Sequence, residues 1–382
     1  MKVREISWRY FDFWLLGAVA LLTIFGVTMI RSAIAGNLEL IEGNTVQKQI
    51  IFAVGGFVVM MLVAVIDYRL LAALSRPLYI GMTGLLIALN LIGGALFGSA
   101  RWFRLGPILI QPSELAKIVM IIVLADFFTQ NQGQMHKIQT VIRSFIWTMG
   151  LTIWILLQPD LSTSVVIFVI WAALLWAAGL ELKHLFMAGG AGLIVIAVAV
   201  PLLIVNYDPE NDTGLIKAYQ IERVLNFIAP EEEARYGSNY NVQQALISIG
   251  SGGWFGQGYE SGSQVQLRFL KVRHSDFIFS ALSQEFGFTG AVFVLLMIFF
   301  VIWRCLRAAR LAADTFGALL AYGVAALFTF QAIVNVGMNL RLLPVTGLVL
   351  PFVSYGGSSL LSMLLGIGLV ESVVLRHKAL EF

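Results

Sequence analysis

Residues 11–30 read FDFWLLGAVALLTIFGVTMI, an almost wholly apolar run. A helix needs about 20 such residues to cross the hydrocarbon core of a bilayer. The run is longer than the apolar core of a signal peptide, and Arg31 follows it at once in place of the small residues of a cleavage site. We therefore expect a first transmembrane helix that the mature protein retains.

Further stretches of this kind follow along the 382 residues. Hydrophobic residues make up 59% of the chain and charged residues 12%, against roughly 25% charged residues in a typical soluble domain. The sequence therefore predicts an all-α integral membrane protein, with ten transmembrane helices in one polytopic domain that covers 1–382. The ten stretches lie at approximately 11–31, 48–66, 78–97, 113–128, 141–157, 161–179, 185–205, 285–303, 315–336 and 358–375.

Lysine and arginine are distributed unevenly about these spans. An even number of spans puts both termini on one side, and the cytoplasmic loops of membrane proteins carry an excess of Lys and Arg. The loops opposite the termini carry six basic residues: Arg31, Lys48, Arg101, Arg104, Lys117 and Arg341. The terminal segments and the loops on their side carry thirteen: Lys2, Arg4, Arg9, Arg69, Arg76, Lys137, Arg143, Lys183, Arg304, Arg307, Arg310, Arg376 and Lys378. We therefore expect both termini in the cytoplasm.

One connection is far longer than the others. Residues 206–284 separate spans seven and eight on the outer side, whereas loops longer than about 15 residues are uncommon and usually functional or disordered. Apolar residues recur with a helical period at 219–228 and 242–249, as in short helices that rest on a bilayer surface. The glycine-rich stretch 250–258, GSGGWFGQG, permits tight turns and a close approach of backbone to a ligand. We expect this extracytoplasmic loop to carry function.

Two charged residues stand one turn apart at the start of the fourth span. In QPSELAK, residues 111–117, the proline suits the first helical position, so Glu114 falls in the first turn and Lys117 on the same face. One interpretation is an intrahelical ion pair with a snorkelling lysine. The other is an anion site, because the positive end of the helix dipole and Lys117 adjoin Arg101 and Arg104 at the outer face. Such a cradle suits a pyrophosphate.

A second candidate lies where the outer loop ends. The stretch HSDFIFSAL, residues 274–282, places Asp276 at the opening of an apolar helix. An aspartate in a first helical turn is ordinary and needs no catalytic role. Alternatively, the apolar residues beside it desolvate the carboxylate and suit it to act as a general base. Glu285 comes about half a helical turn out of phase, which argues against a paired-carboxylate glycosidase site.

Irregular backbone rich in glycine and proline separates the last two expected spans. It includes NVGMN at 335–339, LLPVTG at 342–347 and PFVSYGGSS at 351–359. Such backbone is tolerated at membrane depth only where protein or a wet cavity surrounds it. Close helix packing through small residues and direct contact with a ligand are both consistent with this pattern.

Taken in this order, the three groups resemble the SEDS family of cell-wall proteins (shape, elongation, division, sporulation) over nearly the whole chain. The resemblance implies that Asp276 matches the essential aspartate of the family. The expected substrate-binding residues are Arg101, Arg104, Glu114, Lys117 and Ser358. The matching stretches are 111–117, 158–160, 249–253, 274–279, 343–347 and 354–359, and the departures from the family pattern are Ser162, Lys271, Val272, Gln284 and Arg341.

The resemblance implies a peptidoglycan glycosyltransferase at the outer face of the bacterial cytoplasmic membrane. Members of the family join lipid II units into glycan strands, with a class B penicillin-binding protein as partner transpeptidase. The expected chemistry is a single displacement: Asp276 takes the proton of the acceptor 4-hydroxyl, which attacks the anomeric carbon and inverts it as undecaprenyl pyrophosphate leaves. Residues 262–270 look more like the elongation member than the division member, which implies a place in the elongation machinery.

Cofactor chemistry is little constrained by the sequence. The single cysteine, Cys305, excludes an intramolecular disulfide, and no Cys/His cluster indicates a zinc site. A divalent cation, Mg²⁺ or Mn²⁺, with oxygen ligands is compatible with the chemistry, at a site that the sequence does not identify. No nucleic-acid partner is expected.

A lipid II flippase or another transporter is the main alternative, because ten spans with buried charges suit transport equally well. A non-enzymatic scaffold for the cell-wall machinery is a third reading. The outer loop that carries Asp276 favours an enzyme, since the site of a carrier is expected nearer the middle of the bilayer.

Overall fold

The computed structural model describes residues 8–97, 101–105, 108–180, 227 and 238–377. Two strands, β1 (Phe103–Leu105) and β2 (Ile108–Ile110), pair as an antiparallel hairpin with Phe103 opposite Ile110. All the other elements in the described residues are helices. They are η1 (Trp8–Tyr10), α1 (Phe13–Ile34), α2 (Leu38–Glu42), α3 (Thr45–Val65), α4 (Arg69–Phe97), α5 (Pro112–Gln130), η2 (Gln132–Gln134), α6 (Ile138–Leu156), α7 (Leu161–Ala177), α10 (Ser238–Ser251), α11 (Ser263–Gln266), α12 (Ile278–Leu311), α13 (Thr315–Asn339) and α14 (Gly357–Leu375).

The helical membrane architecture expected from the sequence is confirmed. In the described part of the chain, seven helices are long and apolar enough to cross a bilayer: α1, α3, α4, α6, α12, α13 and α14. Two more expected spans are occupied by α5 and by the shorter α7. The span expected at 185–205 lies outside the described residues, as does the helix expected at 219–228 except for Phe227. The count of ten spans therefore stays a prediction.

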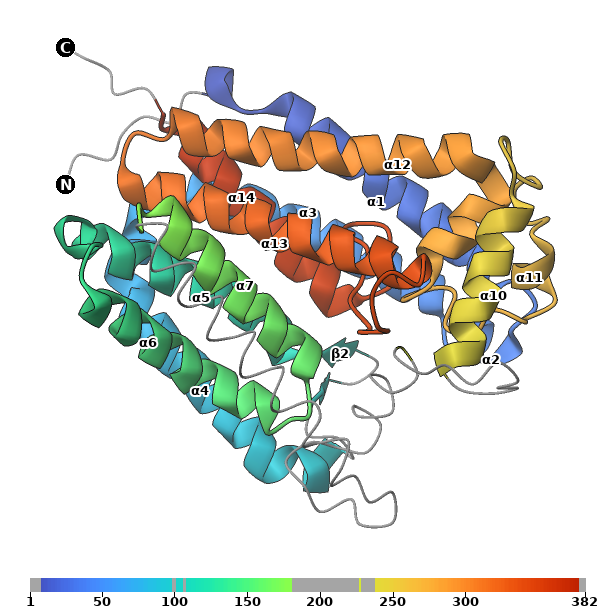
Figure 1. The fold of residues 1–382 in the computed structure, drawn as a ribbon, viewed down its shortest axis with the longest axis horizontal. Coiled ribbons are helices and arrows are strands. Elements are labelled where there is room, and N and C mark those ends of the chain that lie inside the picture. The colour runs from blue at the N-terminus through green and yellow to red at the C-terminus, as the bar shows by residue number, and fades with distance from the viewer. Residues whose placement is uncertain (1–7, 98–100, 106–107, 181–226, 228–237, 378–382) are drawn as a thin grey trace.

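The last two long helices form the interior of the bundle. Of the most apolar 18-residue segment of α14, 89% is buried inside the bundle, and of that of α13, 67% is buried. The corresponding share in α4, at the periphery, is 11%. Figure 1 shows α12 and α1 on one flank of this pair, and α5, α7, α6 and α4 on the other. At Gly368 a Cβ would lie 2.6 Å from the carbonyl oxygen of Met60, so glycine allows α14 to pack directly on α3.

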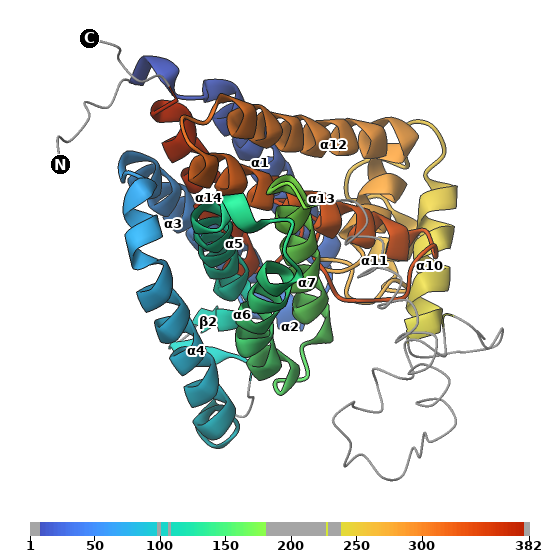
Figure 2. The same cartoon turned by 60° about the vertical axis from the view of Figure 1, so that its left-hand side comes forward.

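The helix α12, at the end of the long connection expected at 206–284, is broken. Gly287, inside α12, has φ 66° and ψ −164°, a conformation that is essentially confined to glycine. At this break, residues 253–258 hydrogen-bond through the main chain with 284–289, for example Gly258 N–H to the Glu285 carbonyl at 3.0 Å and Phe288 N–H to the Gly253 carbonyl at 2.8 Å. The sequence predicts a close approach of the glycine-rich stretch to a ligand. In the structure this stretch lies against the backbone of α12. Both views place α10 and α11 beside this end of α12 (Figures 1 and 2).

The first and last described segments lie side by side at the other end of the bundle. The rings of Tyr10 and His377 meet edge to face with their centroids 4.8 Å apart. Asp12 donates its N–H to Glu371 at 3.0 Å and accepts a hydrogen bond from Arg304 at 2.7 Å. This is the arrangement that an even number of spans requires, while the side of the membrane stays a prediction.

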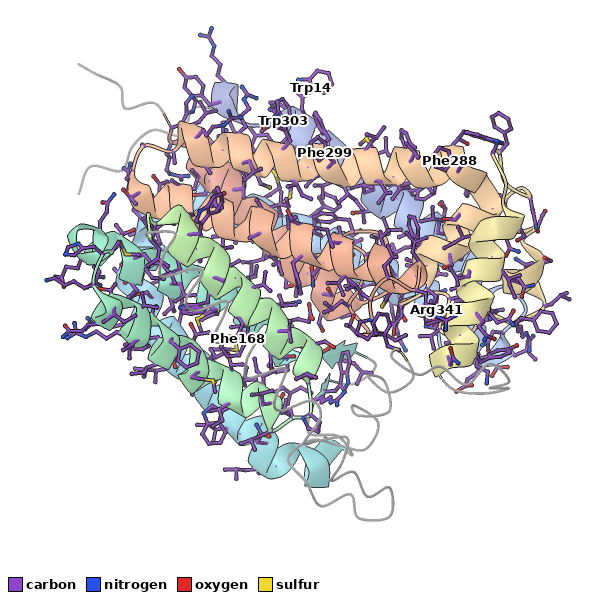
Figure 3. All side chains as sticks on the ribbon, in the orientation of Figure 1. Trp14, Phe168, Phe288, Phe299, Trp303 and Arg341 are labelled. Carbon is purple, nitrogen blue, oxygen red and sulfur yellow. The ribbon has the colours of Figure 1, made fainter. Side chains whose placement is uncertain are left out.

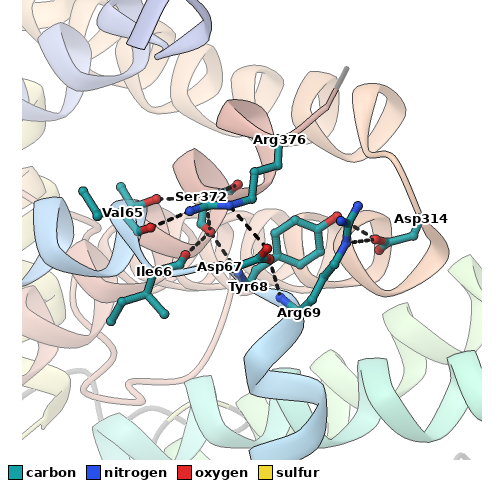
Figure 4. Close-up of polar contacts among 9 residues, drawn as sticks. Val65, Ile66, Asp67, Tyr68, Arg69, Asp314, Ser372 and Arg376 are labelled. Atoms are coloured by element: carbon teal, nitrogen blue, oxygen red, sulfur yellow. Dashed lines mark hydrogen bonds and ion pairs between the residues drawn. The ribbon is translucent and has the colours of Figure 1, made fainter. Parts of the chain in front are cut away.

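The turn between α3 and α4 is fixed at the same end (Figure 4). Arg69 and the Tyr68 hydroxyl donate to Asp314 at 2.8 and 2.7 Å, and Asp314 accepts the Gly317 N–H as the cap of α13. Burial raises the pKa of the Asp314 carboxyl, but these three donors outweigh it and hold the pKa below its usual value. Arg376 completes the network by donating to main-chain carbonyls at the end of α3.

The outer surface of α1 and α12 carries large apolar side chains (Figure 3). Trp14 is 75% exposed, Phe299 64% and Phe288 56%. In a soluble protein such a face would favour aggregation or partner binding, whereas in a membrane protein it faces lipid.

Candidate active site

Asp276 lies in a turn that precedes α12. The helix begins at Ile278, so Asp276 stands two residues before it and not in its first turn, as the sequence suggested. Phe277, Ile278 and Phe279 are buried and anchor the turn in the core. The Asp276 side chain itself is partly exposed. This combination gives a fixed backbone with a carboxylate that solvent or substrate can reach.

The main chain of this turn is held by the segment between α13 and α14. The Tyr355 N–H donates to the carbonyl of His274 at 2.9 Å, and the Ser354 hydroxyl donates to the carbonyl of Ser275 at 2.8 Å. Both donors belong to the stretch 351–359 that the sequence singled out. Through Ser354 and Tyr355, this stretch therefore holds the turn that carries Asp276.

Two asparagines of α13 hold the next carbonyl. The side-chain amides of Asn335 and Asn339 both donate to the carbonyl oxygen of Asp276, each at 3.1 Å. The Asn339 side-chain oxygen also accepts the N–H and the hydroxyl of Ser280, at 3.2 and 2.6 Å. Both asparagines are fully buried. Consecutive carbonyl groups at 274–276 are thus fixed by side chains and backbone far away in the sequence.

The Asp276 carboxylate has its own neighbours. The Ser275 hydroxyl donates to one carboxylate oxygen at 3.0 Å, and a Cβ added at Gly347 would lie 3.6 Å from the other. Glu285 is directed elsewhere, because it accepts a hydrogen bond from Ser32 of α1. The two carboxylates therefore have different neighbours, as expected from their spacing.

His274 and Arg273 lie next to the candidate base. Burial, and then the positive charge of Arg273, lower the pKa of the His274 imidazole to about 4. The ring is therefore neutral at ordinary pH and lies 5.5 Å from the ring of Tyr355, centroid to centroid. Arg273 is buried and donates to the carbonyl of Ala33 in α1.

Glu114 and Lys117 form a buried ion pair at the start of α5. The Lys117 ammonium lies 2.7 Å from a carboxylate oxygen of Glu114, and the side chains are 0% and 10% exposed. The intrahelical pair considered from the sequence is therefore present. An ammonium so buried is stable only with such a partner, because its desolvation is costly.

Ser358, in the first turn of α14, contacts the residues that precede α5. Its hydroxyl accepts the Gln111 N–H at 2.9 Å and donates to the Leu109 carbonyl in β2 at 3.2 Å. The side chain therefore stands beside the same helix start as Glu114 and Lys117. Three of the expected substrate-binding residues are brought together there.

Asp160 is a residue at this site that we did not predict. It caps α7 by accepting the Thr163 N–H at 3.1 Å, and it also accepts from the Gln111 amide at 2.9 Å and the Ser113 hydroxyl at 3.0 Å. The starts of α5 and α7 are thereby joined. The stretch 158–160 was noted as a family match, which was the only signal for it in the sequence.

Arg101 binds the backbone just before α7, next to Asp160. Its guanidinium donates to the carbonyl of Gln158 at 2.7 Å and to the carbonyl of Pro159. In this conformation it supports the backbone before α7. The side chain of Arg104 lies outside the described residues, although its backbone belongs to β1.

One hydrogen bond connects the starts of α5 and α7 with the surroundings of Asp276. The Ser162 hydroxyl, in the first turn of α7, donates to the carbonyl of Thr346, and the next residue is Gly347, which faces the Asp276 carboxylate. The expected catalytic and substrate-binding residues are therefore linked through the starts of α5, α7 and α14, at one end of the bundle (Figure 1).

The described residues do not by themselves form a metal centre. No group of three or more His, Cys, Asp or Glu side chains among them is placed to hold a metal ion. Mg²⁺ often binds through one or two carboxylates together with substrate phosphates. The expected divalent cation thus stays a prediction, and no step is derived through it.

Comparison with known proteins gives a consistent result. The protein family described as Cell cycle protein, whose name joins FtsW, RodA and SpoVE, matches residues 13–379. A probable peptidoglycan glycosyltransferase FtsW of Trichlorobacter lovleyi is 33% identical over 369 residues, covering 95% of this chain and 93% of the relative. Peptidoglycan glycosyltransferase MrdB of Escherichia coli is 33% identical over 360 residues, covering 94% and 92%.

Solved structures agree with the sequence comparisons. A chain from a study of how a peptidoglycan synthase complex coordinates polymerization and crosslinking superposes with a TM-score of 0.78 at 29% identity, over 97% of this chain and 99% of that one. An aspartate-to-alanine variant of the rod shape determining protein RodA from Thermus thermophilus gives a TM-score of 0.68 at 27% identity, over 96% and 98%.

Proposed function

Since this chain belongs to the FtsW, RodA and SpoVE family of cell cycle proteins, we propose that it is a peptidoglycan glycosyltransferase that polymerises lipid II at the outer face of the bacterial cytoplasmic membrane. Relatives that carry the name peptidoglycan glycosyltransferase align over almost the whole chain. The observation that carries the proposal is the clamp on 274–276, which fixes the backbone of Asp276 while its carboxylate stays partly exposed.

The reaction assigns one role to Asp276. The acceptor sugar approaches with its 4-hydroxyl directed at the carboxylate, which takes the proton as the hydroxyl oxygen bonds to the anomeric carbon of the donor. The bond from that carbon to the pyrophosphate oxygen breaks, and undecaprenyl pyrophosphate leaves with the electron pair. A single displacement inverts the anomeric carbon and needs no covalent enzyme intermediate.

The leaving pyrophosphate requires positive potential, and the start of α5 is our candidate. A helix N-terminus carries a partial positive charge, and Lys117 and Arg101 lie beside it. Because Lys117 is paired with Glu114 and Arg101 with carbonyl groups, these cations contribute through the local field and through rearrangement on binding. Arg104 and Ser358 complete the proposed substrate-binding group.

A class B penicillin-binding protein is the proposed partner. The support is the similarity to a chain of a peptidoglycan synthase complex, over 97% of this chain. A partner transpeptidase would crosslink the strands that this chain makes. Co-purified complex should therefore polymerise lipid II faster than the chain alone at matched concentration, and equal rates would count against the coupling.

We further propose a role in elongation and cell shape. The stretch 262–270 resembles the elongation member of the family, and the fold superposes on a rod shape determining protein. The curated relatives include division and elongation proteins at the same 33% identity, so a cellular test is needed. Depletion in a rod-shaped host should give round cells, whereas long filaments would assign the chain to division.

One assay separates the enzyme from the flippase. Purified protein in detergent is incubated with lipid II, and the products are resolved by length on a gel. Detergent provides no second compartment, so transport is undefined there and only a polymerase yields glycan strands. Absence of polymer from folded protein, both alone and with its partner, would refute the proposed activity.

A further inference from the structure

A cavity lies between α4, α5 and α6, away from the candidate active site. Its volume is about 180 Å³, and its lining includes Arg76, Asp126, Phe127, Arg143 and Trp147. Along α5, with its rise of about 1.5 Å per residue, Asp126 is about 20 Å from the helix start that adjoins the active site. The cavity therefore lies toward the opposite end of the bundle, where the first and last described segments meet.

The walls of the cavity are fixed by contacts between helices. The Ser75 hydroxyl of α4 donates to Asp126 of α5 at 2.7 Å, and Gln130 donates to the other carboxylate oxygen at 2.8 Å. Tyr79 of α4 donates to the Trp147 carbonyl of α6 at 2.9 Å, and the two rings meet edge to face. All three helices are thereby linked around the space.

The charges on the lining are unequal. Arg76 comes from α4 and Arg143 from α6, and no side chain in the described part of the chain forms an ion pair with either. Asp126 is engaged by a hydroxyl and an amide instead. Two guanidinium groups and one carboxylate leave one positive charge, which a singly charged anion complements. Guanidinium groups suit phosphate oxygens because their donors match them in pairs.

Apolar surface continues from each arginine along its helix. Ile80 lies one turn beyond Arg76 on the same face of α4 and is 69% exposed. Ile146 lies one turn beyond Arg143 on α6 and is 61% exposed. A free phosphate would not use this surface, whereas lipid chains attached to a bound phosphodiester would lie along it.

We propose that this cavity binds the headgroup of an anionic phospholipid. The phosphodiester lies between Arg76 and Arg143, headgroup hydroxyls donate to Asp126, and the acyl chains run along Ile80 and Ile146. The volume is below the roughly 300 to 1,000 Å³ of a typical whole-ligand pocket, which suits a headgroup whose chains stay outside. Basic pockets between membrane helices are known to bind lipid headgroups in this way.

The test uses the full chain, purified in detergent and stripped of lipid. Phosphatidylglycerol and phosphatidylethanolamine are titrated separately, and bound lipid is counted by native mass spectrometry. The parent should prefer phosphatidylglycerol. Arg76→Gln with Arg143→Gln should weaken that binding roughly 25-fold, or about 5-fold per arginine. Arg307→Gln with Arg310→Gln removes two exposed arginines of α12 at the same end of the bundle and should leave binding unchanged.

Three results would overturn the proposal. They are equal binding of the two lipids, undiminished phosphatidylglycerol binding by the Arg76/Arg143 double variant, and displacement of the lipid by an equimolar amount of inorganic phosphate. Because neither arginine has an ion-pair partner in the described residues, the double variant should melt with the parent when no lipid is present. This control separates lost binding from lost folding.

Discussion

Asn339 donates its side-chain amide to the carbonyl oxygen of Asp276 at 3.1 Å. With its own side-chain oxygen it accepts the N–H and the hydroxyl of Ser280. One buried side chain thus joins the end of α13 to the turn that carries the candidate base and to the first turn of α12.

Asn339→Leu should lower the free energy of unfolding by about 1 to 3 kcal/mol, because it removes the acceptor of the buried Ser280 hydroxyl and N–H and leaves only Asn335, of the two asparagines, to donate to the Asp276 carbonyl. Polymerisation should fall with it, as the turn loosens. Gln331→Leu is the matched control: Gln331 is fully buried in the same helix, and its amide has no hydrogen-bond partner in the described residues. That variant should melt at or above the parent temperature. Identical melting curves for the two variants would contradict the positioning role of Asn339.

Asp276→Asn should fold and insert as the parent does, since the backbone clamp does not involve the carboxylate. An amide cannot take up the acceptor proton, so polymerisation should fall by about 10² to 10⁴. Glu260→Gln, on an exposed side chain of the same outer loop, should retain activity. Glycan yield near the parent level from Asp276→Asn would remove Asp276 from the mechanism.

Lys117 and Glu114 are tested together, because each is the ionic partner of the other. Lys117→Met or Glu114→Gln alone should cost about 3 to 5 kcal/mol of stability, and the double variant less than the sum of the two. If the pair serves the pyrophosphate, the double variant melts near the parent and polymerises poorly. Normal polymerisation by the double variant would make the pair purely structural.

Stability should depend on pH through His274. The folded protein holds the pKa of this imidazole at about 4, against 6.5 for an ordinary histidine, so the unfolded chain binds more protons between these values. Lowering the pH from about 6.5 to about 4 should therefore reduce stability, by at most about 3 kcal/mol. His274→Gln should flatten the melting temperature over this range, while the exposed His136→Gln should not. A parent whose melting temperature does not fall across the range contradicts this assignment.

Gly287→Ala should be severely destabilising. The backbone there has φ 66°, and an added Cβ would lie 2.4 Å from the backbone nitrogen of Gly256. Strain of this kind costs about 1 to 3 kcal/mol before any clash is counted. Gly81→Ala, in α4 with no atom within 4 Å of the added Cβ, should instead stabilise by about 0.5 to 1 kcal/mol. Yield and melting temperature of the two variants in detergent provide the measurement, and similar values would argue against a rigid break in α12.

Sequence reasoning succeeded where the signal is local. An apolar run of about 20 residues defines a span by itself, and the Glu114 and Lys117 pair follows from their spacing on one helix. It failed where partners are distant: Asp160 meets Gln111 across 49 positions, and Asn339 meets Asp276 across 63. No pattern in one sequence specifies such pairs.

The same distinction applies to two further features. Arg101 is basic and near a helix start, which suggests an anion site, but the sequence does not reveal that its guanidinium also donates to two carbonyl groups before α7. The glycines of 250–258 indicate close approach, but the identity of the approaching backbone depends on the break at Gly287. Composition therefore predicts that a residue is charged or that a backbone can approach closely, but it does not predict which group it contacts.

The backbone bonds between 253–258 and 284–289 also set an order of events during synthesis. The two segments are separated by about 30 residues, which a ribosome takes roughly 2 to 6 seconds to add. Until the second segment has been translated, the glycine-rich stretch has no partner for its main chain. In a nascent chain the glycine-rich stretch therefore stays accessible to chaperones and proteases until the start of α12 has been made.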